Sequence, residues 1–409
     1  MLMRRVVVTG MAGMTPLGDN WPAIRAAMHE GRSGVRYIKE WDHLADLNTR
    51  LAAPVDYFEH EKIFPRKKMR SMGRCAALAV KSAENALKDA GLLDDPLLKS
   101  GRVGCAFGSS YGSTEPTIGF VRFMETGIAT GLSAMSYIKM MSHTAVVNVG
   151  IFFGLRGRVI TTSSACTSGS QAIGYSYEAI KYGHAEVMIA GGAEELCPTM
   201  AIVFDTLFAT SCKNHTPDKS PQPYDQNRDG LVIGEGGATL ILEEREHALA
   251  RGATIYAELV GFGTNMDGSH VTDPQTETMG CALKLALADA AIAPSAIDFV
   301  SGHGTATMQG DIAETLATSD VLGADTPIHS LKGYFGHTLG ACGAIEAWLV
   351  IEMMRDGSFA PNINLDQVDE RCGELDYIRG SFREIDALHV MSNNFAFGGI
   401  NTSLIFKRV

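Results

Sequence analysis

A single cysteine stands where the sequence changes from β-branched to small residues. Residues 159–162 form a predicted strand, and Ser163-Ser164-Ala165-Cys166-Thr167-Ser168-Gly169 leads from it into a predicted helix. A thiol at the start of a helix faces unpaired backbone N–H groups, which favour a thiolate and can hold an oxyanion when the sulfur attacks a carbonyl. Cys166 is therefore predicted to be an ionised nucleophile at a strand-turn-helix elbow. The other seven cysteines are interpreted as small core residues.

Two histidines lie in turns framed by glycine in the second half of the chain. His303 stands between Gly302 and Gly304, and His337 lies in the stretch Gly336-His337-Thr338-Leu339-Gly340. A lone histidine in such a loop is usually structural, but glycine permits close backbone approach, and two such turns accompany a predicted nucleophile. Both histidines are therefore candidate catalytic groups, and Lys332, shortly before His337, joins them.

Charged residues beside these turns allow two readings. Asp311 and Glu314 share one helical face after His303, either as a surface pair or as carboxylates that hold a cation or Lys332. The stretch from Pro65 to Arg74 is basic in a chain whose formal net charge is −11. This stretch is either a solvated face or a docking site for an acidic protein or a phosphate, whereas the overall charge disfavours nucleic-acid binding.

The elements that must position these residues recur in the same order twice. Strands are predicted over residues 4–10, 102–107, 159–162, 186–191 and 237–243, with helices over 76–90 and 169–182, and a glycine-rich turn after residue 10. The second half repeats the pattern, with strands over 255–263 and 297–301, near 328, and around 389–392 and 402–406, and helices over 279–290 and up to 354. We predict an α/β protein of two duplicated halves, residues 1–252 with the cysteine and 253–409 with both histidines.

Composition limits the remaining possibilities. The chain has 409 residues, 45% of them apolar, which is an ordinary globular composition large enough for two halves. Its apolar runs are too short to span a bilayer, and no signal-type segment follows Arg4 and Arg5. Eight scattered cysteines without a CxxC pair argue against a zinc site or a disulfide framework. A cytoplasmic protein without membrane insertion or a bound metal is expected.

Taken together, the motifs resemble the elongating β-ketoacyl-[acyl-carrier-protein] synthases of type I and type II. The resemblance spans nearly the whole chain and rests on residues 162–169, His303-Gly304-Thr305-Ala306-Thr307, Lys332, residues 336–340 and Asn393-Asn394-Phe395-Ala396-Phe397-Gly398-Gly399-Ile400-Asn401. It implies a thiolase fold, with the two halves stacked in five layers (α-β-α-β-α), working as a homodimer or as a heterodimer with a related subunit. Ala396 and Ile400 depart from the family, where Gly and Thr are usual.

The resemblance also implies a role for each motif. Cys166 would carry the acyl chain, His303 and His337 would steady the enolate from a malonyl thioester, and Lys332 would hold the histidines. The N–H groups of Cys166 and Phe397 would form an oxyanion hole, and the Phe397 ring would act as a gate. Thr272, Thr305 and Thr307 would contact the pantetheine arm, and Tyr111 would line the acyl pocket. A helix with Arg66, Lys67 and Arg70 would dock the carrier protein. The substrates would arrive on the phosphopantetheine of an acyl carrier protein, and no cofactor of the enzyme's own is expected.

Other functions stay open at this stage. A ketosynthase of a specialised polyketide or polyene pathway would look similar. A thiolase condenses without decarboxylation and uses a second cysteine near its C-terminus, which the stretch 395–401 lacks. A non-catalytic subunit that sets chain length would lack the elbow cysteine.

Overall fold

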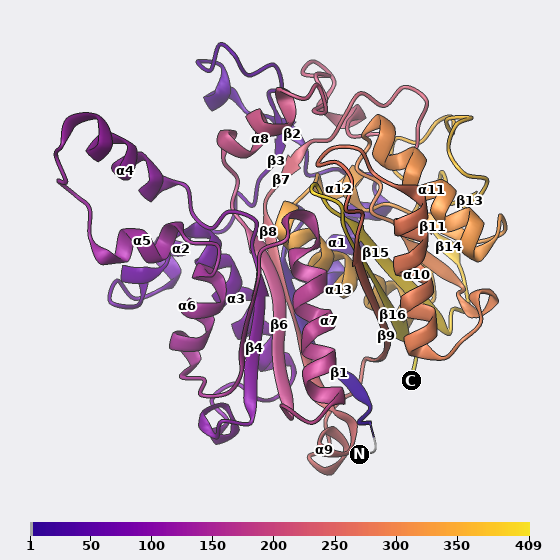
Figure 1. Ribbon diagram of the computed structural model, residues 1–409, viewed down its shortest axis with the longest axis horizontal. Coiled ribbons are helices and arrows are strands. Elements are labelled where there is room, and N and C mark those ends of the chain that lie inside the picture. Colours follow the sequence, from indigo (N-terminus) through magenta and orange to yellow (C-terminus); the bar gives the residue numbers. More distant parts are fainter. Residues whose placement is uncertain (1–2) are drawn as a thin grey trace.

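One mixed sheet runs through the computed structural model, which describes residues 3–409 (Figure 1). Its eleven strands lie in the order β13-β11-β10-β15-β16-β9-β1-β8-β6-β4-β5. The first half supplies β1 (Val6–Met14), β4 (Val103–Gly108), β5 (Val159–Thr162), β6 (Val187–Glu194) and β8 (Gly236–Glu244). The second half supplies β9 (Ala257–Met266), β10 (Phe299–Ser301), β11 (Pro327–His329), β13 (Asp376–Tyr377), β15 (His389–Phe395) and β16 (Ile400–Lys407).

The two halves of the sheet have the same topology. The order β5-β4-β6-β8-β1 corresponds to β11-β10-β15-β16-β9, with two parallel pairings followed by two antiparallel pairings in each half. Strands β1 and β9, which begin the two halves, pair with each other and join them. The predicted duplication is therefore confirmed, whereas the boundary at residues 252 and 253 stays a prediction.

Helices complete five layers. Helices α7 (Ser168–Lys181) and α13 (Cys342–Asp356) lie between the two halves of the sheet, and nearly every residue of both is buried, as all-round packing requires. Helices α3 (Arg74–Asp89) and α6 (Thr144–Phe153) cover the outer face of the first half of the sheet. Helices α10 (Thr276–Ala290) and α11 (Met308–Leu322) cover the outer face of the second half. The predicted α-β-α-β-α stack is the arrangement found.

Shorter elements complete the chain. The helices are α1 (Trp21–His29), α2 (His60–Ile63), α4 (Glu115–Thr126), α5 (Ala134–Met140), α8 (Pro198–Asp205), α9 (Arg245–Ala250) and α12 (Lys332–Phe335). The strands are β2 (Arg36–Tyr37), β3 (Leu51–Ala53), β7 (Ile233–Gly234), β12 (Ser358–Phe359) and β14 (Arg383–Glu384). None of the helices within residues 3–409 has both the length and the apolar character that a membrane span needs.

One local prediction was wrong, and one segment was not predicted. The glycine-rich turn expected after residue 10 lies inside β1, because Gly10 packs so closely on α3 that a Cβ would come within 2.5 Å of the Ala86 carbonyl oxygen. Helices α4 and α5 were not predicted; they form an arm that extends from the first half (Figure 1). In α4 only Pro116 is buried, so the chain itself provides little of the packing by which an amphipathic helix is usually recognised.

Candidate active site

Three segments far apart in the sequence bring Cys166, His303 and His337 to one cavity of about 420 Å³. Cys166 lies on a short 3₁₀ helix (Ala165–Thr167) that leads into α7. His303 follows β10, and His337 follows α12. All three side chains line the cavity, and all three residues are buried. The elbow and the two glycine-framed turns therefore form one site.

The Cys166 thiol is neutral at rest, which corrects the prediction of a thiolate. Cys166 is 4% exposed, and burial raises the pKa of its thiol to about 11. Backbone N–H groups of Phe397 and Cys166, together with the Lys332 ammonium, act in the opposite direction without overcoming burial. The same two N–H groups contact the sulfur, so they lie beside the place where the carbonyl oxygen of an attacked thioester would become an oxyanion.

His337 points a hydrogen-bond donor at the sulfur. Its Nε2 lies 3.0 Å from Cys166 Sγ, and its Nδ1 accepts a hydrogen bond of 3.3 Å from the Leu339 backbone N–H. Burial, followed by the charge of Lys332, holds the pKa of His337 well below its ordinary value, so the ring is neutral. A neutral imidazole has one hydrogen, and because Nδ1 accepts, Nε2 must donate.

His303 is fixed in the same tautomer by a different partner. Lys332 Nζ lies 3.2 Å from His303 Nδ1 and 2.5 Å from Glu346 Oε1. Burial alone would lower the pKa of Lys332, but the Glu346 carboxylate outweighs it and the pKa rises, so Lys332 is an ammonium. Burial and this ammonium keep the pKa of His303 well below its usual range. His303 is therefore neutral, with hydrogen on Nε2.

The two rings face one space. Their centroids are 5.1 Å apart and their planes lie at 85° to each other. Cys166, His303 and His337 place ligand atoms within 4.8 Å of one another, a spacing that would suit a metal ion. A metal would need an unprotonated Nε2 on each ring, yet both Nδ1 atoms face donors that keep the hydrogen on Nε2. The ring tautomers thus suit an anionic oxygen better than a metal.

Other predicted site residues form the cavity wall. Thr272, Thr305, Thr307 and Phe397 line it, and Thr305 Oγ1 lies 2.9 Å from Thr307 Oγ1. The rings of Phe397 and Phe204 meet edge to face with centroids 5.9 Å apart. These positions suit a pantetheine arm and a gate, roles that stay predictions.

Asp311 and Glu314 are buried, so the surface-pair reading was wrong, and neither holds Lys332. Glu314 accepts the backbone N–H groups of His303 and Gly304, and burial raises its pKa to about 8. Asp311 accepts the N–H of Ala306, and burial raises its pKa to about 6. Both carboxyls therefore shape the turn that carries His303.

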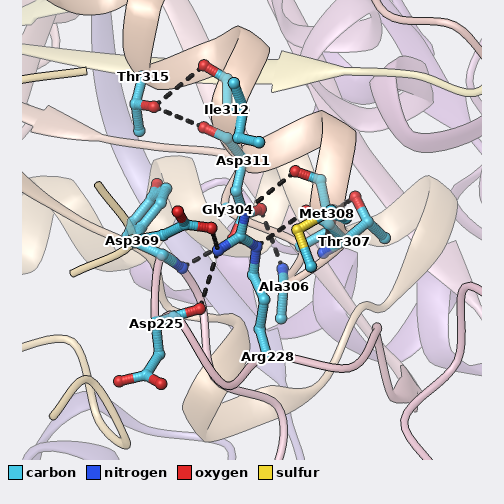
Figure 2. A network of polar contacts seen from close by, with 12 residues as sticks. Asp225, Arg228, Gly304, Ala306, Thr307, Met308, Asp311, Ile312, Thr315 and Asp369 are labelled. Atoms are coloured by element: carbon cyan, nitrogen blue, oxygen red, sulfur yellow. Dashed lines mark hydrogen bonds and ion pairs between the residues drawn. The ribbon is translucent and has the colours of Figure 1, made fainter. Parts of the chain in front are cut away.

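The loop around Arg228 also reaches this turn (Figure 2). Its guanidinium is fully buried, pairs with Asp369 at 2.7 Å, and donates to the carbonyls of Thr307 and Met308. It lies 3.6 Å from Asp311. The polar contacts of this loop thus extend to the wall of the cavity.

Three predicted residue sets lie outside the cavity. Tyr111 is exposed and does not line it in the single chain, so its place in an acyl pocket stays a prediction. Arg66, Lys67 and Arg70 are exposed and make no ion pair within residues 3–409, but the expected docking helix is only a 3₁₀ turn (Lys68–Ser71). Among the cysteines interpreted as core, Cys212 and Cys281 are exposed.

Three groups that complete the site had no role assigned to them from the sequence. Glu346 lies on α13 and binds Lys332, Asn394 Nδ2 donates to Glu346 at 2.6 Å, and the Leu339 N–H orients His337. Leu339 has φ of 47°, and such a left-handed non-glycine residue is not recognisable from its type. The completed site combines a thiol nucleophile with two neutral N–H donors, a set suited to acyl transfer through an anionic oxygen intermediate.

Comparison with known proteins agrees with this chemistry. The Beta-ketoacyl synthase N-terminal domain model matches residues 3–248, and the Beta-ketoacyl synthase C-terminal domain model matches residues 256–366. The 3-oxoacyl-[acyl-carrier-protein] synthase 2 of Vibrio harveyi is 36% identical over 417 residues, covering 100% of both chains. A beta-ketoacyl synthase from Burkholderia phymatum STM815 has a crystal structure similar to this chain, with 56% identity, a TM-score of 0.98 and full coverage of both chains. A ketosynthase solved with a type II PKS acyl-carrier protein, bound to the hexaketide, is 30% identical with a TM-score of 0.88 and full coverage of both chains.

Proposed function

The chain belongs to the β-ketoacyl synthase family, and we propose that it condenses malonyl-[acyl-carrier-protein] with an acyl chain held on Cys166. The product is a β-ketoacyl-[acyl-carrier-protein], and the reaction is an elongation step of fatty-acid synthesis. The single observation that carries the proposal is the convergence of the Cys166 sulfur with two neutral imidazoles that both present Nε2–H.

Acyl loading is the first half-reaction. The Cys166 sulfur attacks the carrier-bound thioester, the oxyanion is held by the N–H groups of Cys166 and Phe397, and the pantetheine sulfur leaves. The thiol proton ends on the departing pantetheine thiol, so no net proton is exchanged. Because the resting thiol has a pKa of about 11, loading depends on stabilising negative charge as the sulfur attacks.

Decarboxylation and condensation follow. The malonyl thioester oxygen is placed between the Nε2–H donors of His303 and His337, which strengthen their hydrogen bonds as CO₂ leaves and the oxygen becomes an enolate. The enolate carbon attacks the Cys166 thioester, forming a carbon–carbon bond and releasing the Cys166 sulfur as a thiolate, which takes up one proton from solvent to restore the thiol. Lys332 acts through His303, because its ammonium keeps the hydrogen of that ring on Nε2.

A non-decarboxylating thiolase is the nearest alternative reaction. Cys342 lies close to Cys166, but its Sγ contacts the Cys166 carbonyl oxygen and it does not line the cavity. Supplying acetyl-CoA and malonyl-carrier side by side tests the assignment. Product that forms from acetyl-CoA alone would contradict it.

A specialised polyketide or polyene ketosynthase would use the same site on other acyl chains. Ala396 lies next to Phe397 in the cavity wall, so this departure from the family can affect which chains enter. A panel of acyl carriers of graded length, with unsaturated and aryl chains included, separates the two pathways. Preference for saturated chains supports fatty-acid elongation.

An acyl carrier protein is the proposed partner, as in the solved ketosynthase complex. We expect reversal of the charges of Arg66, Lys67 and Arg70 to glutamate to raise KM for carrier substrates about tenfold or more, because unpaired surface cations attract an acidic partner. Free pantetheine thioesters should be affected much less. Steady-state kinetics on both substrates measures the difference.

A matched variant controls for net charge. Lys88, Lys99 and Lys284 are exposed and lie outside residues 65–74, so their triple change to glutamate alters the net charge equally. An equal rise in KM for both triple variants would mean that long-range charge, and no docking site, is responsible.

The homodimer is also part of the proposal. Strand β5 lies at the edge of the sheet, where Val159 is 57% exposed, and the arm carries exposed Ile118 and Met124. An open apolar edge strand is a surface that a second copy, or a related subunit, can pair with. Sedimentation of the purified chain measures its oligomeric state.

A cytoplasmic location is also proposed, since all eight cysteines are free.

A further inference from the structure

Phe208 is the most exposed large apolar side chain within residues 3–409. Its relative exposure is 90%, although it contributes to the wall of the cavity that holds Cys166. A single exposed apolar residue needs no explanation, but one at the opening of an active-site cavity is positioned to meet whatever enters.

The backbone of Phe208 is strained as well. It follows α8 with φ of 53°, and its N–H donates to the Asp205 carbonyl at 3.0 Å, while the Ala209 N–H donates to the Phe204 carbonyl at 3.0 Å. A left-handed residue just after a helix is usually glycine, because a side chain there is sterically disfavoured. Exposure and strain both disfavour phenylalanine in the isolated chain, so the ring is better explained by an intermolecular contact.

Three further residues continue this surface around the opening. Leu207, Val271 and Met308 also line the cavity, with exposures of 45%, 54% and 37%. They come from the loop after α8, from the loop before α10, and from the start of α11. No lysine lines the cavity among the described residues, and its one arginine, Arg228, is already paired with Asp369. The other charged lining residues are the carboxyl groups of Asp229, Asp267, Asp273 and Glu314, so contact with an acidic carrier would have to come from the apolar residues.

We propose that Leu207, Phe208, Val271 and Met308 form an apolar rim that seats the acyl carrier protein around the attachment point of its pantetheine arm. The proposal rests on the proposed function: an arm that reaches Cys166 through this cavity requires the carrier body to cover the cavity opening. Phe208 is the proposed anchor, because it is the most exposed of the four residues and so has the most apolar surface for the carrier to bury. The basic stretch around Arg66 would attract the carrier protein by its charge, and the apolar rim would make the close contacts once the carrier is bound.

Two variants at position 208 separate docking from folding. Phe208→Gly removes the ring and the strain, whereas Phe208→Ala removes the ring and keeps the Cβ. We expect both to lower the ratio of kcat/KM for malonyl-carrier over malonyl-pantetheine about tenfold, as loss of an interface anchor does. Only Phe208→Gly should melt at a higher temperature than the parent, since glycine takes this φ without strain.

Leu249→Ala is the matched control, because Leu249 is 47% exposed on α9, at the opposite end of the molecule from α8 (Figure 1). An unchanged substrate ratio in both position-208 variants would overturn the rim, as would an equal loss on carrier and free pantetheine, which would place the ring inside the substrate channel. Failure of the parent enzyme to turn over either malonyl substrate would instead contradict the proposed function.

Discussion

Replacing Cys166 with alanine is expected to abolish condensation and leave the fold intact. The sulfur is the only cysteine sulfur in the cavity wall of the described chain, so no other thiol can accept the acyl group. We expect the condensation rate to fall by about a thousandfold or more, the scale of losing a covalent nucleophile. The decarboxylation of malonyl-carrier should persist, because His303 and His337 remain in place. Product analysis by mass spectrometry and thermal melting together measure both expectations.

Cys342 provides the matched control for this variant. It is buried, its Sγ lies 3.2 Å from the Cys166 carbonyl oxygen, and it does not line the cavity. Cys342→Ala should therefore load and condense at rates near those of the parent. Condensation that continues in Cys166→Ala, or that stops in Cys342→Ala, would contradict the assignment of the nucleophile.

Removing either imidazole is expected to impair decarboxylation more than acyl loading. His303→Ala deletes one of two Nε2–H donors aimed at the developing enolate, and the loss of one such donor typically slows a reaction about 10²- to 10³-fold. Loading should be least affected in His303→Ala, because His337, at 3.0 Å, is the ring whose Nε2 contacts the sulfur. Release of labelled CO₂ and formation of acyl-enzyme measure the two steps separately.

Glutamine variants make this comparison sharper. The amide Nε2 of glutamine can donate where imidazole Nε2 donates, so His303→Gln should recover part of the rate lost in His303→Ala. The recovery expected at His303 is incomplete, because the glutamine side chain cannot place an acceptor atom where His303 Nδ1 meets Lys332 while its amide nitrogen takes the place of Nε2. Equal losses in loading and decarboxylation, with no recovery by glutamine, would mean that the histidines hold structure and do not stabilise an enolate.

Much of the fold and the identity of the reacting groups could be predicted from local sequence. The strands, the helices over 76–90 and 169–182 and the duplicated order follow from apolar periodicity, which is a property of neighbouring residues. The arm of α4 and α5 could not be predicted in this way, because its apolar side chains are exposed in the single chain and do not mark a buried face. The segment Lys68–Ser71, predicted as part of a carrier-docking helix, is only a 3₁₀ turn, since basic residues do not define the length of a helix.

Residue type and flanking glycines are local properties, so a thiol, two histidines and a lysine in turns that permit close backbone approach could be predicted from the sequence. The positions of their protons depend on the folded chain. Burial makes the Cys166 thiol neutral, and the Leu339 N–H and the Lys332 ammonium, held by Glu346, direct both imidazole hydrogens into the cavity. These proton positions follow from desolvation and from partners brought together from distant segments, neither of which is contained in the order of neighbouring residues.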